Sequence, residues 1–386
     1  MQNQYRHHLV NWVNGMKIQQ QHFVLLENAM LERVASAAAI TLHEQNFGLL
    51  TQEPAKASCE LTHDMDGSWK LRLLHCNGIT PDGLHIQLPL LPPVTGFVMP
   101  GITYHPLPES SETCFVIVEQ HIYERIPVGD IDTTELPYRN PAAIAEIHLK
   151  IIAANIMDQV GVGPGQIVLA RILSAHQKPV IDQQYIPPCM YITSHHLLID
   201  YFNDVHHYLS EIMLYANEII RHIRMRENNQ DLAACILEIC KGMGDLISYL
   251  LPELAHITRF QGPVYLFTML SKVTGNFQML TTYRIGQWRE QVFNYFALWL
   301  DITPGVFESM IWAARNIEYY HLDIAGSLKP GLDLLSILHK LTKNISQLEY
   351  IGVKPDNKIF VKEELQREMP DTDNVINKKN RWRFTD

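Results

Sequence analysis

Histidine is the residue type in this sequence that most invites a chemical role, because it serves as metal ligand and as general base near neutral pH. The chain holds 19 histidines, and six of them form adjacent pairs at 7–8, 195–196 and 206–207. Adjacent side chains on a helix diverge by about 100°, so one pair cannot point two ligands the same way. No H-E-x-x-H pattern occurs. We therefore expect solvated or helix-capping histidines and no metal site.

Other reactive patterns are incomplete. The glycine-rich stretch 161–165 lacks the Lys-Ser/Thr pair of a phosphate-binding loop, and 64–67 begins like a calcium loop without its closing Glu. No G-x-S-x-G motif is present, and the six cysteines have no C-x-x-C spacing. The sequence predicts no catalytic residues, no cofactor and no enzyme. A metal-dependent hydrolase that uses the histidines is a remote alternative, for which stoichiometric zinc would be the evidence.

Composition and charge exclude further classes. The formal net charge is -10, with 41 acidic and 31 basic residues, which argues against nonspecific nucleic-acid binding. The first residues lack the pattern of a signal peptide, and no run reaches the roughly 18 apolar residues that span a bilayer. We expect a cytoplasmic protein without direct membrane insertion.

The first half of the chain is predicted to form strands. Between residues 57 and 192, turn residues at 64–68 and 81–83 each include a Gly where positive φ is needed. Runs rich in β-branched and aromatic residues stand at 114–118 and 166–172, and prolines punctuate the region. Short strands between Pro and Gly turns favour an antiparallel sandwich over a parallel sheet.

The second half begins with an uninterrupted heptad pattern, in which apolar residues alternate spacings of four and three. These residues are Leu198, Phe202, Val205, Leu209, Ile212, Ala216, Ile219 and Ile223. Such a seam makes helices wind together. Because more apolar residues lie off the seam, we expect a homotrimer around a helix at about 195–225, with the seam at its axis. Packing within the same chain is the alternative.

Further helices are predicted on both sides of this one. A pattern rich in Ala, Leu and Glu covers residues 22–45. Later helices are expected at 232–250 (closed by Pro252), from Pro263, at about 288–300, from Thr303-Pro304, and at about 332–348. From Gly352 on, the sequence is polar and we expect little order.

Five local patterns, in this order, resemble the TssK (ImpJ/VasE) family of type VI secretion baseplate proteins. They are Asn11-Trp12-Val13-Asn14-Gly15-Met16 with Gln21-His22-Phe23, then Phe47-Gly48-Leu49-Leu50, Pro81-Asp82-Gly83, Leu169-Ala170-Arg171-Ile172 with Tyr185-Ile186-Pro187-Pro188-Cys189, and Tyr265-Leu266 through Gly275-Asn276-Phe277. The resemblance covers about residues 10 to 300. Asn14, Gln20 and Val24 replace the family's acidic residue, proline and glutamine.

The resemblance implies an α+β multidomain fold. Residues 1–190 would form an antiparallel β-sandwich shell, similar to the shoulder of phage receptor-binding proteins, and 191–301 a helical-bundle neck. It implies a trimeric adaptor that links the TssF and TssG wedge proteins to the cytoplasmic part of the membrane complex. The protein would then lie at the cytoplasmic face of the bacterial inner membrane, inside a phage tail-like contractile injection system.

The N-terminal motif is the expected wedge-docking site. Its residues are Trp12, Gly15, Met16, Gln21, His22 and Phe23. Large apolar groups near a terminus mark either a core edge or an interface, so core packing is the alternative.

The resemblance ends near Asp301. Residues 302–386 are therefore expected to form a small, mainly helical head with a polar tail, separable from the rest. The candidate residues for the membrane partner are Arg381, Trp382, Arg383 and Phe384, because Trp and Arg are frequent in interface hot spots. The alternative is a tail that folds back onto its own helices.

A contractile-phage tail adaptor or receptor-binding protein is the alternative function, because it would share the shell and the stalk. Neighbouring genes would separate the two. Sheath, tube and spike genes without capsid genes favour secretion.

Overall fold

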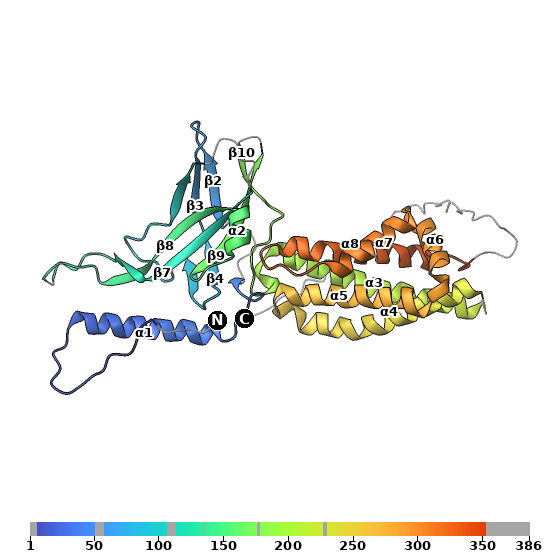
Figure 1. Cartoon of the computed structure of the whole chain (residues 1–386), viewed down its shortest axis with the longest axis horizontal. Helices are drawn as coiled ribbons and strands as arrows, with labels where there is room; N and C mark the ends of the chain where they lie inside the picture. The colour runs from blue at the N-terminus through green and yellow to red at the C-terminus, as the bar shows by residue number, and fades with distance from the viewer. Residues whose placement is uncertain are drawn as a thin grey trace, which may run out of the picture. The chain divides into compact units, whose positions relative to one another are not determined.

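The computed structural model describes residues 6–50, 58–105, 113–134, 136–175, 178–226 and 230–352. In these ranges the chain is an α+β protein in which one helix comes first, antiparallel strands follow and a group of helices comes last, as the sequence predicted (Figure 1). Gly352 begins a second unit of the chain, and beyond it the residues lie outside those described.

The strands form three antiparallel sheets, ordered β1-β4-β5, β2-β3-β6 and β10-β9-β7-β8. The strands are β1 (Gly48–Leu49), β2 (Cys59–His63), β3 (Trp69–Leu73), β4 (Cys76–Ile79), β5 (His85–Leu88), β6 (Gly101–Tyr104), β7 (Cys114–Val128), β8 (Ala142–Ala153), β9 (Gln166–Ala175) and β10 (Lys178–Ile181). In β3 burial alternates strictly, as expected of a strand with one face on a core.

Both predicted turns close hairpins. The first joins β2 to β3, with the Asp64 N–H donating to the Ser68 carbonyl at 3.0 Å. The second joins β4 to β5, with the Thr80 N–H donating to Leu84 at 2.9 Å and Gly83 at φ 88°. These expectations are confirmed because turn chemistry is local.

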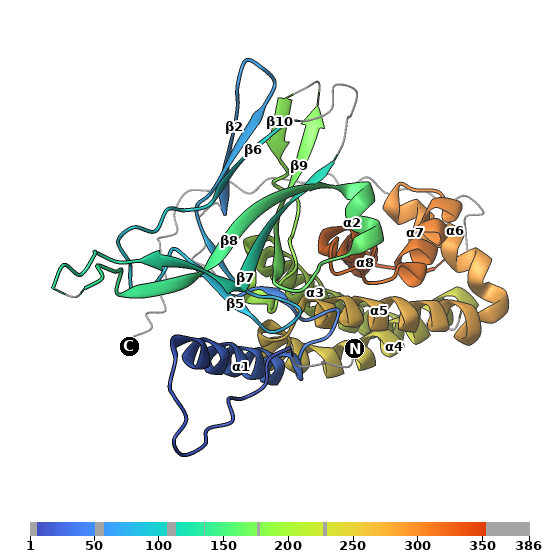
Figure 2. The same ribbon diagram turned by 60° about the vertical axis from the view of Figure 1, so that its left-hand side comes forward.

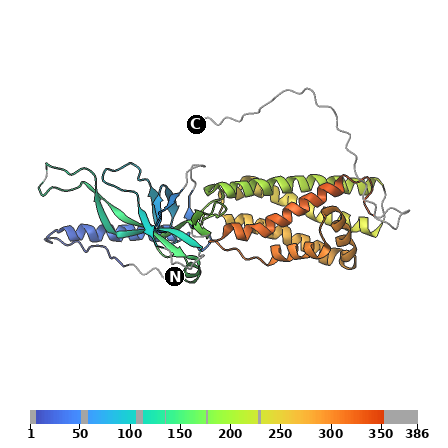
Figure 3. The same cartoon turned by 90° about the horizontal axis from the view of Figure 1, so that it is seen from above.

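The helices are α1 (Gln20–Ala39), α2 (Ala154–Val160), α3 (His196–Met225), α4 (Asp231–His256), α5 (Pro263–Met279), α6 (Arg289–Leu300), α7 (Pro304–Asn316) and α8 (Ile324–Ser346). In Figure 3 the yellow-green α3 and the orange-red α8 run along each other, and these two helices are in contact. Helices α3 to α8 share one apolar core.

Three predicted helix limits are wrong. Helix α1 ends at Ala39 rather than near residue 45, and a turn follows in which the Thr41 hydroxyl donates to the Ala38 carbonyl at 3.0 Å. Helix α4 continues past Pro252 to His256, because Leu254 beyond the proline is fully buried and its burial offsets the hydrogen bond that proline removes. Helix α8 begins at Ile324 rather than near 332, because the Asp323 carboxylate accepts from the Gly326 N–H at 3.2 Å and caps it there.

The heptad seam of α3 lies inside the chain's own bundle. All eight seam residues are buried in the single chain, and α3 packs against α4 and α8. The seam therefore cannot also face other copies at a trimer axis, and that assignment is corrected to the intrachain alternative. A 3.5-residue repeat reports that a helix is covered, but it does not report by which chain.

The predicted boundary at residue 302 also changes. Helix α7 packs on α5, and α8 packs on α3 and α5, with its apolar residues in the same core. Residues 302–351 are thus built into the bundle, and we now place the start of any separate C-terminal part after Ile351.

Within the described ranges, none of the helices is both long enough and apolar enough to cross a membrane.

Candidate interaction surface

The predicted N-terminal motif folds into a turn followed by the start of α1. The Met16 N–H donates to the Val13 carbonyl at 3.2 Å, and Gly15 adopts φ 79° in this turn. The Gln19 N–H donates to Nδ1 of His22 at 3.2 Å, which satisfies one of the free amides at the helix start. The motif therefore fixes how the chain enters α1.

Trp12 and Phe23 meet on the outside of this turn. Their ring centroids are 6.3 Å apart, and Trp12 also meets the edge of His22 at 6.0 Å. Trp12 is 45% exposed and Phe23 51%, so neither ring is part of a core. Core packing, the alternative considered for this motif, does not describe these two rings. Met16 and His22 are half-buried, and Gly15 and Gln21 are exposed.

Polar side chains attach helix α1 to strand β7 and to the N-terminal segment before the helix. Arg125 of β7 pairs with Glu27 and donates to the Asn28 amide oxygen at 2.7 Å. The Glu32 carboxylate accepts from the backbone N–H groups of Arg6 and His7, at 2.7 and 2.9 Å. Burial raises the pKa of Glu32, but these hydrogen bonds outweigh burial and lower it below its ordinary value.

Small residues complete the attachment. Ala35 of α1 is buried, and its carbonyl lies 2.3 Å from the position that a Cβ of Gly83 would take. Only glycine can hold the hairpin turn this close to the helix. Figure 2 shows α1 next to the sheet region.

The large apolar side chains of α1 point away from this attachment. Phe23, Met30 and Val34 are exposed and spaced by seven and four residues, which places them on one stripe of the helix. Asn28 and Ala35 lie on the attached side. Together with Trp12, the stripe forms the N-terminal apolar surface, defined here as Trp12, Phe23, Met30 and Val34. The helix thus buries small and polar residues and exposes large apolar ones, and exposed apolar patches of this kind commonly mark interaction sites.

The motif at residues 47–50 pairs with the motif at residues 185–189, although the two are distant in sequence. The Leu49 N–H donates to the Pro188 carbonyl at 2.8 Å, and the Met190 N–H donates back to Leu49 at 2.8 Å. Gly48, at φ 111°, lies so close to Pro188 that a Cβ would clash with its backbone. The glycine of the first motif is therefore required by its close approach to the second motif.

A second junction, which the sequence did not predict, joins the loop before α8 to the segment before β1. Nε2 of His321 donates to the Phe47 carbonyl at 2.9 Å, so Nδ1 of the neutral ring accepts from the Tyr319 hydroxyl at 2.8 Å. Burial lowers the pKa of His321 to about 4. Nearby, Arg171 holds Asp182 through two contacts of 2.7 and 2.8 Å.

The described residues offer little nucleophilic chemistry. All six cysteines are buried, and burial raises the pKa of Cys76 to about 12. His195 caps α3 by accepting from the Leu197 N–H at 3.3 Å, which confirms a capping role. Two groups of His and Glu side chains within the described ranges come close enough to share an ion, His207-Glu211-His339 and Glu124-Glu146-His148. The residues Arg381, Trp382, Arg383 and Phe384 lie outside the described ranges.

Antiparallel sheets followed by a helical bundle, with an apolar stripe of α1 exposed, define the class of protein as an α+β fold of two regions. Solved structures of the same fold come from the type VI secretion baseplate. A crystal structure of TssK matches with a TM-score of 0.50 at 15% identity, over 85% of this chain and 68% of that one.

A chain of the baseplate complex from the type VI secretion system also matches, with a TM-score of 0.50 at 15% identity, over 88% of this chain and 100% of that one. The TssK-TssF-TssG baseplate subcomplex matches at 0.46 and 14% identity, over 86% and 99%. No protein-family model and no curated protein matches the sequence. The resemblance to TssK seen in the sequence is confirmed at the level of the fold.

Proposed function

We propose that this chain is a structural subunit of a type VI secretion baseplate with the role of TssK. Its β region would serve as a shell, with the sheets arranged as a sandwich, and its helical bundle as a neck. It would act as a homotrimeric adaptor in the cytoplasm, at the inner-membrane face. The support is the TssK fold across most of the chain, together with the family patterns in the sequence.

The docking part of this proposal rests on α1, which buries small and polar residues and exposes large apolar ones. Its attached side holds Asn28 and Ala35, whereas Phe23, Met30 and Val34 face outward beside Trp12. We propose that TssF and TssG, the wedge partners implied by the resemblance, cover this surface. Apolar rings desolvated at the centre of an interface contribute strongly to binding.

The trimer contact must involve residues other than the α3 seam, which the chain's own helices cover. The membrane-complex partner would bind the C-terminal part after Ile351, where Arg381, Trp382, Arg383 and Phe384 are the candidate anchors.

Copurification with wedge proteins encoded beside this gene tests the proposal. The wild type should copurify with them, and the double variant Trp12→Ala/Phe23→Ala should not. Trp312→Ala/Phe260→Ala is a matched control, because it removes the same two ring types from positions 70% and 64% exposed in the helical region.

The control should bind as the wild type does. Circular dichroism shows whether each variant keeps its fold. If the folded Trp12→Ala/Phe23→Ala protein binds the wedge undiminished, the docking surface is elsewhere.

A further inference from the structure

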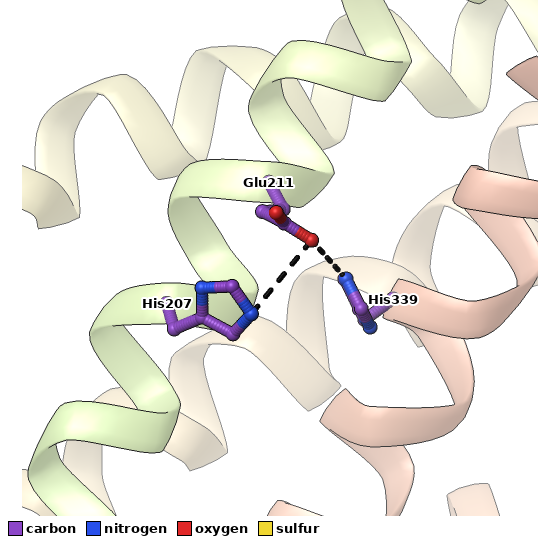
Figure 4. Close-up of side chains that lie close together, drawn as sticks. All are labelled: His207, Glu211 and His339. Atoms are coloured by element: carbon purple, nitrogen blue, oxygen red, sulfur yellow. Dashed lines mark hydrogen bonds and ion pairs between the residues drawn. The ribbon is translucent and has the colours of Figure 1, made fainter. Parts of the chain in front are cut away.

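Three side chains from two helices that are distant in sequence meet on the surface of the helical bundle (Figure 4). Nε2 of His339, on α8, lies 2.6 Å from Oε2 of Glu211 on α3. Nε2 of His207, one helical turn before Glu211, lies 3.8 Å from the same oxygen. All three ligand atoms lie within 4.8 Å of one another.

We propose that His207, Glu211 and His339 form a Zn²⁺ site that links α3 to α8. Two imidazoles and one carboxylate are a ligand set that zinc takes in proteins, with water or another group at the fourth position. Ligand atoms at about 2.0–2.2 Å from a tetrahedral zinc stand roughly 3.3 Å apart. The present spacing is close to that, so a small rotation of the exposed His207 side chain suffices.

Neighbouring side chains hold two of the ligands in place. The Tyr215 hydroxyl donates to Oε2 of Glu211 at 3.1 Å, and the Tyr208 ring lies 5.0 Å from that of His339. Ligands oriented by such neighbours bind metals more tightly than free side chains do. The His339 side chain is mostly buried, whereas that of His207 is mostly exposed, so an ion could enter from solvent.

A plain ion pair between the helices is the competing explanation. It needs only Glu211 and His339, which already contact each other. His207 adds only a longer ion pair, 3.8 Å from the same carboxylate oxygen, which the contact between Glu211 and His339 does not require. Removing His207 therefore separates the two explanations, since it deletes a metal ligand and leaves the pair intact.

The test uses the full-length chain without an affinity tag, dialysed against a chelator and then titrated with zinc chloride in a calorimeter. The wild type should bind about one zinc per chain at this site, and zinc should raise its melting temperature. His207→Ala should bind at least tenfold more weakly. His206→Ala is the matched control, because it removes the exposed neighbouring histidine, and it should bind like the wild type.

Two results would overturn the proposal. One is the absence of a site that depends on His207. It would appear as a wild type that binds no zinc, or as a His207→Ala variant that binds zinc as tightly as the wild type. The other is binding that is lost in His148→Ala and kept in His207→Ala, which would assign the ion to the group at Glu124, Glu146 and His148.

Discussion

At the scale of single residues, α3 shows that a heptad pattern predicts which residues are buried but not which helices bury them. Leu209 lies on the seam and is fully buried, whereas Leu214, five residues further along the helix, is 56% exposed. The heptad spacing places Leu209 on the seam and Leu214 off it, in agreement with their burial. The sequence therefore predicted that Leu209 is covered but not that α4 and α8 cover it.

Leu209→Ala should destabilise the fold strongly, and Leu214→Ala should not. A buried Leu→Ala substitution costs about 2–5 kcal/mol, because it removes apolar contacts and leaves a cavity. An exposed site usually changes stability by about 0.5 kcal/mol or less. Urea unfolding followed by circular dichroism measures both. Equal losses in the two variants would show that α3 is not packed as described.

His321 should make the protein less stable in acid. Its pKa is lowered to about 4 in the folded chain, chiefly by burial, from an ordinary value of 6.5. Below pH 6.5 the His321 imidazole is therefore protonated in the unfolded chain, whereas in the folded chain it stays neutral until about pH 4. Stability is lost across this window as pH falls, by up to about 1.4 kcal/mol per pH unit.

His321→Gln keeps groups that can donate to Phe47 and accept from Tyr319, but it does not titrate. The slope of unfolding free energy against pH between 6.5 and 4 should be shallower in this variant. His206→Gln, at an exposed position, should keep the wild-type slope. An unchanged slope in His321→Gln would mean that this ring does not stay neutral in the fold.

At the scale of elements, the sequence predicted best what local chemistry determines. Thr303-Pro304 marked the start of α7, and the Thr303 hydroxyl does accept from the Val306 N–H at 3.3 Å. The start of α8 was missed, because Gly326 and Pro330 obscure a helix whose first turn is stabilised by burial of Ile324 and Leu328. Such burial depends on distant segments, and the one local signal for this start is the Asp323 side chain that caps the helix.

The N-terminal surface was predicted in part. The motif from Trp12 to Phe23 was identified, but Met30 and Val34 were not. Which stripe of α1 is exposed depends on which side of the helix packs against the sheet region. The contact of Ala35 with Gly83 makes that attachment, and it joins residues that no local pattern connects.

Truncation after Asp301 should leave an insoluble or unfolded chain, because it removes α7 and α8 from the bundle core. The residues lost from the core include Leu334, Leu335, Leu338, Leu341 and Ile345. Burial of each stabilises by about 1.5–3 kcal/mol, and the total is comparable with the net stability of a whole domain. Truncation after Ile351 should leave a soluble, folded protein. Solubility and circular dichroism of the two truncated chains decide between these outcomes. A folded chain ending at Asp301 would support a separate C-terminal head that begins at residue 302.

At the scale of the whole molecule, we expect a trimer in solution. The expectation comes from the resemblance to TssK, and the contact must involve surface that the chain itself leaves uncovered. Multi-angle light scattering at micromolar concentration should give the mass of three chains. The truncation after Ile351 should keep that mass if the C-terminal part is dispensable for assembly. A monomer for the wild type would contradict the adaptor role as proposed.

Hydrogen exchange of the chain, alone and bound to its wedge proteins, tests the central claim most directly. The account predicts slower amide exchange on binding across residues 9–40, which carry Trp12, Phe23, Met30 and Val34, with α4 unchanged as an internal reference. This result would place the wedge on the N-terminal apolar surface. Unchanged exchange over residues 9–40, with protection elsewhere in the complex, would contradict it.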